Sequence, residues 1–212
     1  MTQTQSSYKA REKRRREHEI VLEARRLFRE SGAVSFNMDS LAEAVGVSKP
    51  TLYQHFRSKE DLIVRVLVDA IGEMGDYLDS THENSPLERL KKAMRLVLEQ
   101  RYSVDGLRTD LENGMVYSSL HSRPEVVEAK NRTLAIVNQV IDDGKASGEI
   151  VSYIPTALLG CLFFRLAGLP STVQVLLSAE TGDVPNIETV SPIFDHVIDL
   201  FARSIALETP TI

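Results

Sequence analysis

The stretch "NMDSLAEAVGVSKPTLYQHFRSKEDL", residues 37–62, contains two short amphipathic helix patterns on either side of one glycine. Asn37 can cap the first helix, and Gly46 can end it after two turns, because glycine tolerates the left-handed backbone that closes many helices. Ser48 offers a new N-cap at once. Pro50 fits the first turn of the second helix, where the amide hydrogens have no helical partner. Two helices therefore meet at a tight turn.

A longer amphipathic helix precedes this pair. Its apolar residues recur at helical spacing, and they are Ile20, Val21, Ala24, Leu27 and Phe28. Ser31-Gly32 supplies a stop, and Ser58 can cap a fourth helix with Asp61 three residues later. Two short helices with a glycine turn, braced by a longer helix, form the helix-turn-helix arrangement, in which the second short helix can enter a DNA major groove.

Helical periodicity divides the second short helix into two sides. Leu52 and Phe56 share one side and are expected to pack inward. The opposite side holds Pro50, Thr51 and Gln54, with Tyr53 and His55 beside it and Lys49 at its start. We expect Lys49, Thr51 and Gln54 to reach base edges, and Tyr53, His55 and Lys59 to contact phosphates. The alternative is a pair of ordinary surface helices.

Charge is distributed unevenly along the 212 residues. Residues 1–60 hold 12 Lys and Arg against 8 Asp and Glu, whereas the remaining 152 residues hold 13 against 22. A basic N-terminal quarter on an acidic body favours a phosphate-binding head, although uneven scatter of surface charge is the simpler alternative. The segment "YKAREKRRRE" at 8–17, with Arg14, Arg15 and Arg16, is expected to be either a DNA-contacting arm or a solvated tail.

Residues 37–62 resemble the DNA-binding signature of the tetracycline-repressor (TetR) family of bacterial transcription regulators. The family typically has Leu-Tyr-x-His-Phe followed by a lysine three residues on, and Leu52, Tyr53, His55, Phe56 and Lys59 stand in those places. The resemblance is close over residues 20–67. Residues 140–150, "VIDDGKASGEI", resemble the end of a long helix in many members.

The resemblance implies a homodimer of all-α subunits. Each would have an N-terminal three-helix helix-turn-helix domain and a C-terminal helical domain for ligand binding and dimerisation. The expected divisions are a basic arm at 1–15, the DNA-binding domain at 16–62 and the regulatory domain at 63–212. The expected DNA-binding residues are Arg14, Arg15, Arg16, Asn37, Ser48, Lys49, Pro50, Thr51, Tyr53, Gln54, His55 and Lys59.

Two C-terminal helix patterns favour assembly. Residues 154–169 are apolar almost all round, and residues 193–207 carry a wide apolar face, so both helices need burial on more than one side. A symmetric four-helix contact would supply it, and two-fold dimers are the commonest closed assembly. The expected interface residues are Leu158, Leu162, Phe163, Phe194, Val197, Ile198, Phe201 and Ile205. The alternative is a monomer whose own core buries both helices.

The sequence offers no enzymatic or metal-binding constellation, so we expect no enzyme activity, cofactor or metal. The five histidines form no metal-ligand pair, and the single cysteine, Cys161, is expected to be a small core residue. Arg165 interrupts an apolar helix, where it would make an interface salt bridge, snorkel to solvent or bind an anionic ligand. Candidate polar points of an effector pocket are Tyr102, Asn113, Tyr117, His121 and Arg165.

The sequence thus predicts a homodimeric repressor that binds palindromic double-stranded DNA and is released by an unknown small-molecule effector. The alternative is a DNA-bound factor of the same fold whose C-terminal domain binds a protein and no metabolite. The first twenty residues are polar and basic, and the longest apolar run is too short to span a bilayer, so we expect a cytoplasmic protein without membrane contact.

Overall fold

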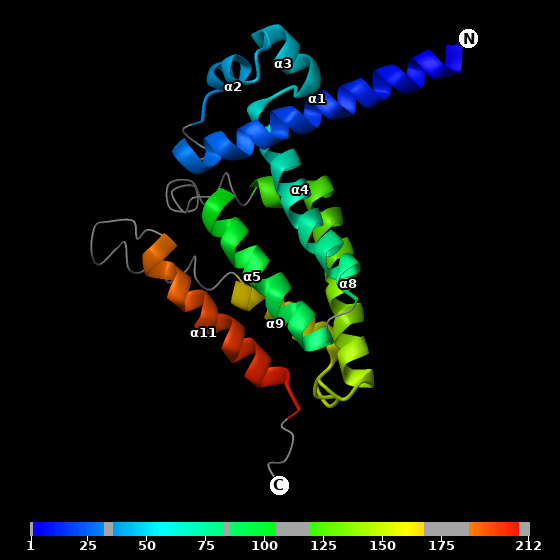
Figure 1. Ribbon diagram of the computed structural model, residues 1–212, viewed down its shortest axis with the longest axis vertical. Coiled ribbons are helices and arrows are strands. Elements are labelled where there is room, and N and C mark those ends of the chain that lie inside the picture. Colours follow the sequence, from blue (N-terminus) through cyan, green and yellow to red (C-terminus); the bar gives the residue numbers. More distant parts are fainter. Residues whose placement is uncertain (1, 32–35, 83–84, 105–118, 168–186, 208–212) are drawn as a thin grey trace. The chain divides into compact units, whose positions relative to one another are not determined.

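The computed structural model describes residues 2–31, 36–82, 85–104, 119–167 and 187–207, and these form helices joined by short connections (Figure 1). An isolated antiparallel bridge joins Ile150 and Ala206. The prediction of an all-α chain is confirmed. Contacts divide the chain into two compact units. Unit 1 comprises Met1–Asp69 and Val104–Val126, and unit 2 comprises Ala70–Ser103 and Val127–Ile212. The predicted boundary after residue 62 stays a prediction.

Unit 1 contains the expected helix-turn-helix. It is formed by α1 (Thr2–Ser31), α2 (Met38–Ala44), α3 (Lys49–His55) and the first part of α4 (Lys59–Ser80). Figure 1 shows α2 and α3 beside α1, and α2 contacts both of the other helices. A single apolar cluster joins all four helices, and its fully buried members include Ile20, Phe28, Leu41, Leu52 and Leu62.

The two short helices begin and end where the sequence predicts. The Asp39 amide donates to Asn37 Oδ1 at 2.9 Å, and the Thr51 amide donates to Ser48 Oγ at 3.3 Å, so both N-cap predictions are confirmed. Gly46 has φ of 68°. A residue with a Cβ would be strained there, which is why glycine ends α2.

The basic segment differs from the expected arm, because it is the first half of one long helix. Ion pairs one turn apart connect its charges, and Arg15 contacts Glu12 at 3.0 Å and Glu19 at 3.1 Å. Lys13 and Glu17 form a similar pair at 3.8 Å. Pairs at this spacing stabilise helices. This pattern accounts for the helical conformation of a segment that basic composition suggested was an arm.

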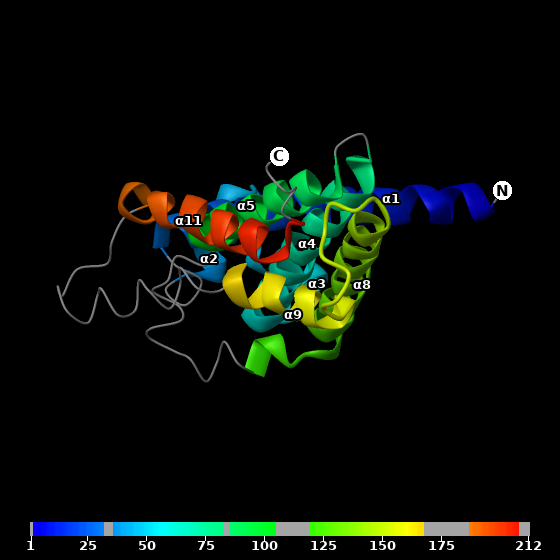
Figure 2. The ribbon, with the colours of Figure 1, turned by 90° about the horizontal axis from the view of Figure 1, so that it is seen from below.

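Unit 2 is a set of packed helices. It contains the rest of α4, α5 (Pro86–Val104), most of α8 (Pro124–Ala146), α9 (Thr156–Ala167) and α11 (Ile187–Ile205). Figure 2 shows α9 alongside α11, and the two helices contact each other. Phe163 of α9 and Phe201 of α11 meet edge to face, with ring centroids 5.5 Å apart. This aromatic pair lies in a large apolar cluster shared by the helices of unit 2.

The segment after α8 explains the glycines of "DDGKASGEI". Gly148 has φ of 78° and reverses the chain, and the amides of Glu149 and Ile150 then donate to the Gly144 carbonyl. Ile150 is fully buried and lies directly against Gly144. The chain therefore needs glycine at position 148 for its backbone conformation and at position 144 for a close approach.

One sequence prediction in unit 2 is wrong. Cys161 is exposed rather than buried, because it lies on the side of α9 that faces away from the core. The last helix begins at Ile187, before the apolar pattern of residues 193–207, so Pro192 lies inside it. A proline inside a helix removes one backbone donor, and its ring crowds the carbonyl four residues before it.

A pair of glycine substitutions tests this packing. A Cβ at position 144 would lie 2.8 Å from Ile150 Cγ1 and 3.1 Å from Pro86 Cβ. Gly144→Ala should therefore lower the free energy of unfolding by about 1–3 kcal/mol in urea denaturation. Gly72→Ala is the matched control, because no atom lies within 4 Å of its Cβ position in α4. That substitution should stabilise the protein by about 0.5–1 kcal/mol, and equal effects of the two substitutions would contradict the close approach.

Candidate nucleic-acid interface

Helix α3 presents one polar face to solvent. Leu52 is fully buried and Phe56 is 6% exposed, so these two residues anchor the helix to the core of unit 1. Of the six predicted contact residues on α3, four are exposed, namely Lys49, Pro50, Tyr53 and Gln54. The orientation that helical periodicity predicted for these side chains is therefore present, and their DNA contacts stay a prediction.

The charge at the start of α3 is already paired. Lys49 Nζ lies 2.8 Å from Asp39 Oδ1 and 3.0 Å from Oδ2, which joins α3 to the first turn of α2. The hydrogen bond to Asp39 raises the pKa of Lys49 above its ordinary value. Both side chains are more than half exposed, so the pair is worth little in stability. Lys49 can exchange Asp39 for a base or a phosphate at small cost.

Three other predicted contact residues shape the backbone of this region. Asn37 and Ser48 use their side-chain oxygens as N-caps. The Thr51 hydroxyl lies 2.8 Å from the Ser48 hydroxyl, and Thr51 is half-buried. Since a capping oxygen accepts hydrogen bonds from inside the helix, these residues fix the start of each short helix whether or not they also contact DNA.

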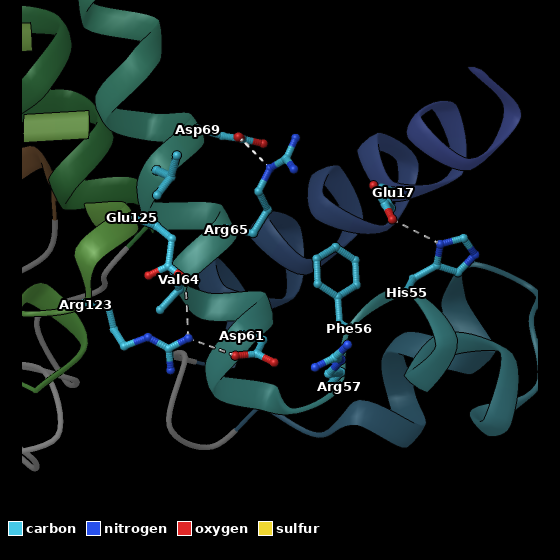
Figure 3. Close-up of a pocket in the computed structure, with 11 residues that line it drawn as sticks. Glu17, His55, Phe56, Arg57, Asp61, Val64, Arg65, Asp69, Arg123 and Glu125 are labelled. Atoms are coloured by element: carbon cyan, nitrogen blue, oxygen red, sulfur yellow. Dashed lines mark hydrogen bonds and ion pairs between the residues drawn. The ribbon is translucent and has the colours of Figure 1, made fainter. Parts of the chain in front are cut away.

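His55 lies toward α1 rather than fully outward. It is half-buried, and its Nδ1 lies 3.6 Å from Glu17 Oε1 (Figure 3). The two groups form an ion pair when the imidazole is protonated. His55 therefore connects the end of α3 to α1 in the structure, a contact that helical periodicity within residues 49–56 could not reveal.

Lys59 also contacts its own chain. Its Nζ donates to the Phe36 carbonyl at 2.7 Å and lies 5.6 Å from the centre of the Phe36 ring. Burial lowers the pKa of Lys59. This predicted phosphate contact is thus a half-buried group with partners already in place.

The basic half of α1 is partly neutralised. Arg15 pairs with two glutamates, and Arg16 Nη1 lies 3.0 Å from Glu19 Oε2. Arg14 is exposed on the same helix. Of the three arginines that the sequence assigned to DNA, Arg14 is the one without a carboxylate partner among the described residues.

An open pocket of about 710 Å³ lies within unit 1, beside the end of α3 (Figure 3). Its charged side chains come from α1, the connection between α3 and α4, α4 itself, and the start of α8 with the residue before it. Arg123 Nη2 lies 3.2 Å from Asp61 Oδ1, and Arg65 Nε donates to Asp69 at 2.8 Å. The pairing of Arg123 with Asp61 could not be predicted from the sequence, because a separation of 62 residues leaves no local signal.

The candidate effector residues are not assembled into a pocket by the described residues. Asn113, Tyr117 and the side chain of Tyr102 lie outside the described part of the chain. His121 is half-buried in unit 1, whereas Arg165 is exposed on α9 in unit 2. Of the alternatives for Arg165, its exposure favours a solvated or interface side chain.

The predicted dimer residues divide into two groups. Leu158 is 59% exposed and Leu162 is half-buried. The other six are buried in the core of their own chain, with at most 5% exposure, and they are Phe163, Phe194, Val197, Ile198, Phe201 and Ile205. A side chain without exposed surface in one chain cannot bury more against a second, so we correct the prediction for these six.

Neither a metal site nor a membrane span emerges from the described residues. No group of three or more His, Cys, Asp or Glu side chains is arranged to hold a metal ion in these ranges. No described helix is both long enough and apolar enough to cross a bilayer.

Comparison with known proteins gives a consistent result. Residues 20–66 match the family model of bacterial regulatory proteins, tetR family. The transcriptional regulator YvaF of Bacillus subtilis (strain 168), itself uncharacterised, is 34% identical over 94 residues, which are 44% of this chain and 49% of YvaF. The transcriptional activator FasR of Mycolicibacterium smegmatis is 32% identical over 60% of this chain and 58% of its own. The matches thus span about half the length of these relatives.

Solved structures add the fold of most of the chain. The transcriptional regulator FadR from Bacillus subtilis, crystallised in complex with stearoyl-CoA, aligns with a TM-score of 0.57 and 19% identity. The alignment covers 87% of this chain and 97% of FadR. At that identity the likeness shows the fold alone. Residues 20–66 thus match the tetR family of bacterial regulatory proteins, and the rest of the alignment shows that the chain shares the fold of a solved transcriptional regulator.

Proposed function

We propose that the chain is a homodimeric transcriptional repressor whose two α3 helices read adjacent major grooves of a palindromic operator. The observation that carries this proposal is the exposed polar face of α3 on a rigid apolar anchor. Lys49 and Gln54 are exposed, whereas Leu52 on the opposite side is fully buried. Side chains held in this way can reach base edges with little loss of conformational entropy on binding.

The dimer part of the proposal rests on apolar side chains that one chain leaves exposed. Leu158 of α9 is 59% exposed and Leu200 of α11 is 55% exposed, on two helices that contact each other. A second copy that covers these side chains would bury them by two-fold symmetry. Recognition helices about 34 to 36 Å apart, or a multiple of this distance, would then meet successive major grooves.

The effector part of the proposal rests on the connection between the two units. Helices α4 and α8 each begin in unit 1 and end in unit 2, and Arg123, just before α8, pairs with Asp61 in the first turn of α4. A ligand that prefers one arrangement of these helices would change the spacing of the two α3 helices and so the affinity for DNA. Long-chain acyl-CoA is the first compound class to test, because FadR binds stearoyl-CoA.

The proposal is tested by selecting bound DNA from a random pool at physiological salt. Small molecules are then screened for release of the protein from the selected DNA. The proposal is supported if the selected site is palindromic, if a small molecule releases the protein from this site, and if the protein represses a reporter gene controlled by it. Activation of the reporter gene would instead indicate a transcriptional activator, the role that the name of FasR describes. If no compound releases the protein from its site and a pull-down recovers one protein partner, the alternative of a DNA-bound interaction factor would be supported.

Gln54→Ala tests base reading by α3. Loss of the amide should relax the preference at one base pair of each half-site, at a cost of about 1–3 kcal/mol for the preferred base. The measurement is the sequence enriched from the random pool. Gln139→Ala is the matched control, because Gln139 is an exposed amide on α8 in unit 2. An unchanged preference at every position in Gln54→Ala would remove α3 from the base contacts.

Arg14→Ala tests the basic half of α1. If Arg14 contacts a phosphate, the negative slope of log affinity against log salt should become shallower by about one in Arg14→Ala, because one fewer counterion is released. Arg14→Lys keeps the charge and should keep the slope. If this segment is only a solvated surface, the wild type, Arg14→Ala and Arg14→Lys should all show the same slope.

Leu158→Asp with Leu200→Asp tests the dimer. The paired substitution should give a folded monomer in sedimentation, because both side chains are exposed in one chain and a carboxylate opposes burial against a second. Leu22→Asp is the control, since Leu22 is 49% exposed on α1 in unit 1. A dimer that survives the paired substitution would show that assembly uses another surface.

A further inference from the structure

Lys59 occupies an unusual position for a cation. It is the first residue of α4, where the exposed amides of a helix carry partial positive charge and disfavour an ammonium group. Its side chain leaves this end of the helix and reaches back across 23 residues to the Phe36 carbonyl, with an N–O distance of 2.7 Å. The contact satisfies a carbonyl in the connection between α1 and α2.

Phe36 is itself fixed in the core of unit 1. Its side chain is 4% exposed, and its ring meets Phe28 of α1 edge to face with centroids 4.9 Å apart. The Lys59 ammonium lies 5.6 Å from the centre of the same ring. A cation over an aromatic face adds to the hydrogen bond. The Lys59 ammonium therefore contacts both the backbone carbonyl and the aromatic ring of Phe36.

The position of Phe36 gives this contact its consequence. Phe36 directly precedes Asn37, the N-cap of α2, and α2 leads through Gly46 into α3. A shift of the chain at Phe36 would move the start of α2 and, with it, the helix that bears Gln54. The Lys59 contact joins the start of α4 to the start of α2 and so holds the short helix pair at both of its ends.

We infer that Lys59 is a positioning residue for DNA binding, which acts through Phe36 and holds α2 and α3 in the reading geometry from inside unit 1. This inference rests on the proposed DNA-binding function and differs from a phosphate contact by Lys59. An ammonium group has three N–H donors, so the inference concerns the one donor that the Phe36 carbonyl accepts, whatever the other two contact. Burial also lowers the pKa of Lys59, as expected for a group with reduced contact with water.

Two substitutions separate positioning from phosphate contact. Lys59→Met keeps the apolar stem and removes both the charge and the donor. Lys59→Gln removes the charge but keeps an N–H donor, on a side chain that is one bond shorter. Hydrogen exchange of the α2 amides in the DNA-free protein reports the contact, and the salt dependence of DNA affinity reports the number of phosphate contacts.

For a positioning residue, Lys59→Met should raise exchange at the Asp39 and Leu41 amides about tenfold, the order expected for one lost hydrogen bond. It should also lower affinity for the selected site while leaving the log-log salt slope unchanged. Lys59→Gln should recover most of the amide protection and keep the wild-type slope, and it provides the test if Lys59→Met does not fold.

A phosphate contact predicts the opposite pattern. Both substitutions would then make the negative salt slope shallower by about one and leave the amide protection in α2 unchanged. This result would overturn the inference. The exchange measurement needs no DNA. If the wild-type protein selected no DNA sequence, the proposed function would fail, whereas unchanged α2 exchange in Lys59→Met would separately reject the contact with Phe36 as a structural tie.

Discussion

Burial of Leu41 and Leu52 in the apolar cluster that joins α2 and α3 to α1 and α4 is the constraint on which the rest of unit 1 depends. Helices α2 and α3 have seven residues each, and isolated helices of this length are not stable in water. Both leucines are fully buried in one apolar cluster with Phe28. The tertiary contact therefore holds the short helices in place, and the polar face of α3 is exposed because its apolar side is used for this contact.

Charges around this framework are paired within the chain before any ligand arrives. Lys49 pairs with Asp39, Arg15 pairs with Glu12 and Glu19, and Lys59 donates to the Phe36 carbonyl. The exposed pairs are weak, because water screens them, and they can be exchanged for phosphates at small cost. The half-buried Lys59 contact is harder to replace. Burial thus separates the exposed charges proposed to contact DNA from Lys59, which we propose to act by positioning.

Local signals in the sequence predicted much of the fold and of the exposed face of α3. Asn37, Gly46 and Ser48 act within a few residues of the turns they form, so capping rules and glycine preferences identify them. His55 could not be assigned in this way, because its direction depends on the location of Glu17 on α1. In unit 2, an almost wholly apolar α9 gave no sign that Leu158 and Cys161 face outward. Long-range packing decides each of these cases.

The central claim is that α3 reads base edges in the major groove. Dimethyl sulfate footprinting on the selected DNA tests it most directly, because guanine N7 lies in the major groove and adenine N3 in the minor groove. The account predicts protection of guanine N7 in two half-sites whose centres lie about 10 base pairs, or a multiple of one helical turn, apart. Protection confined to adenine N3, or no protection of guanines within the selected site, would contradict it.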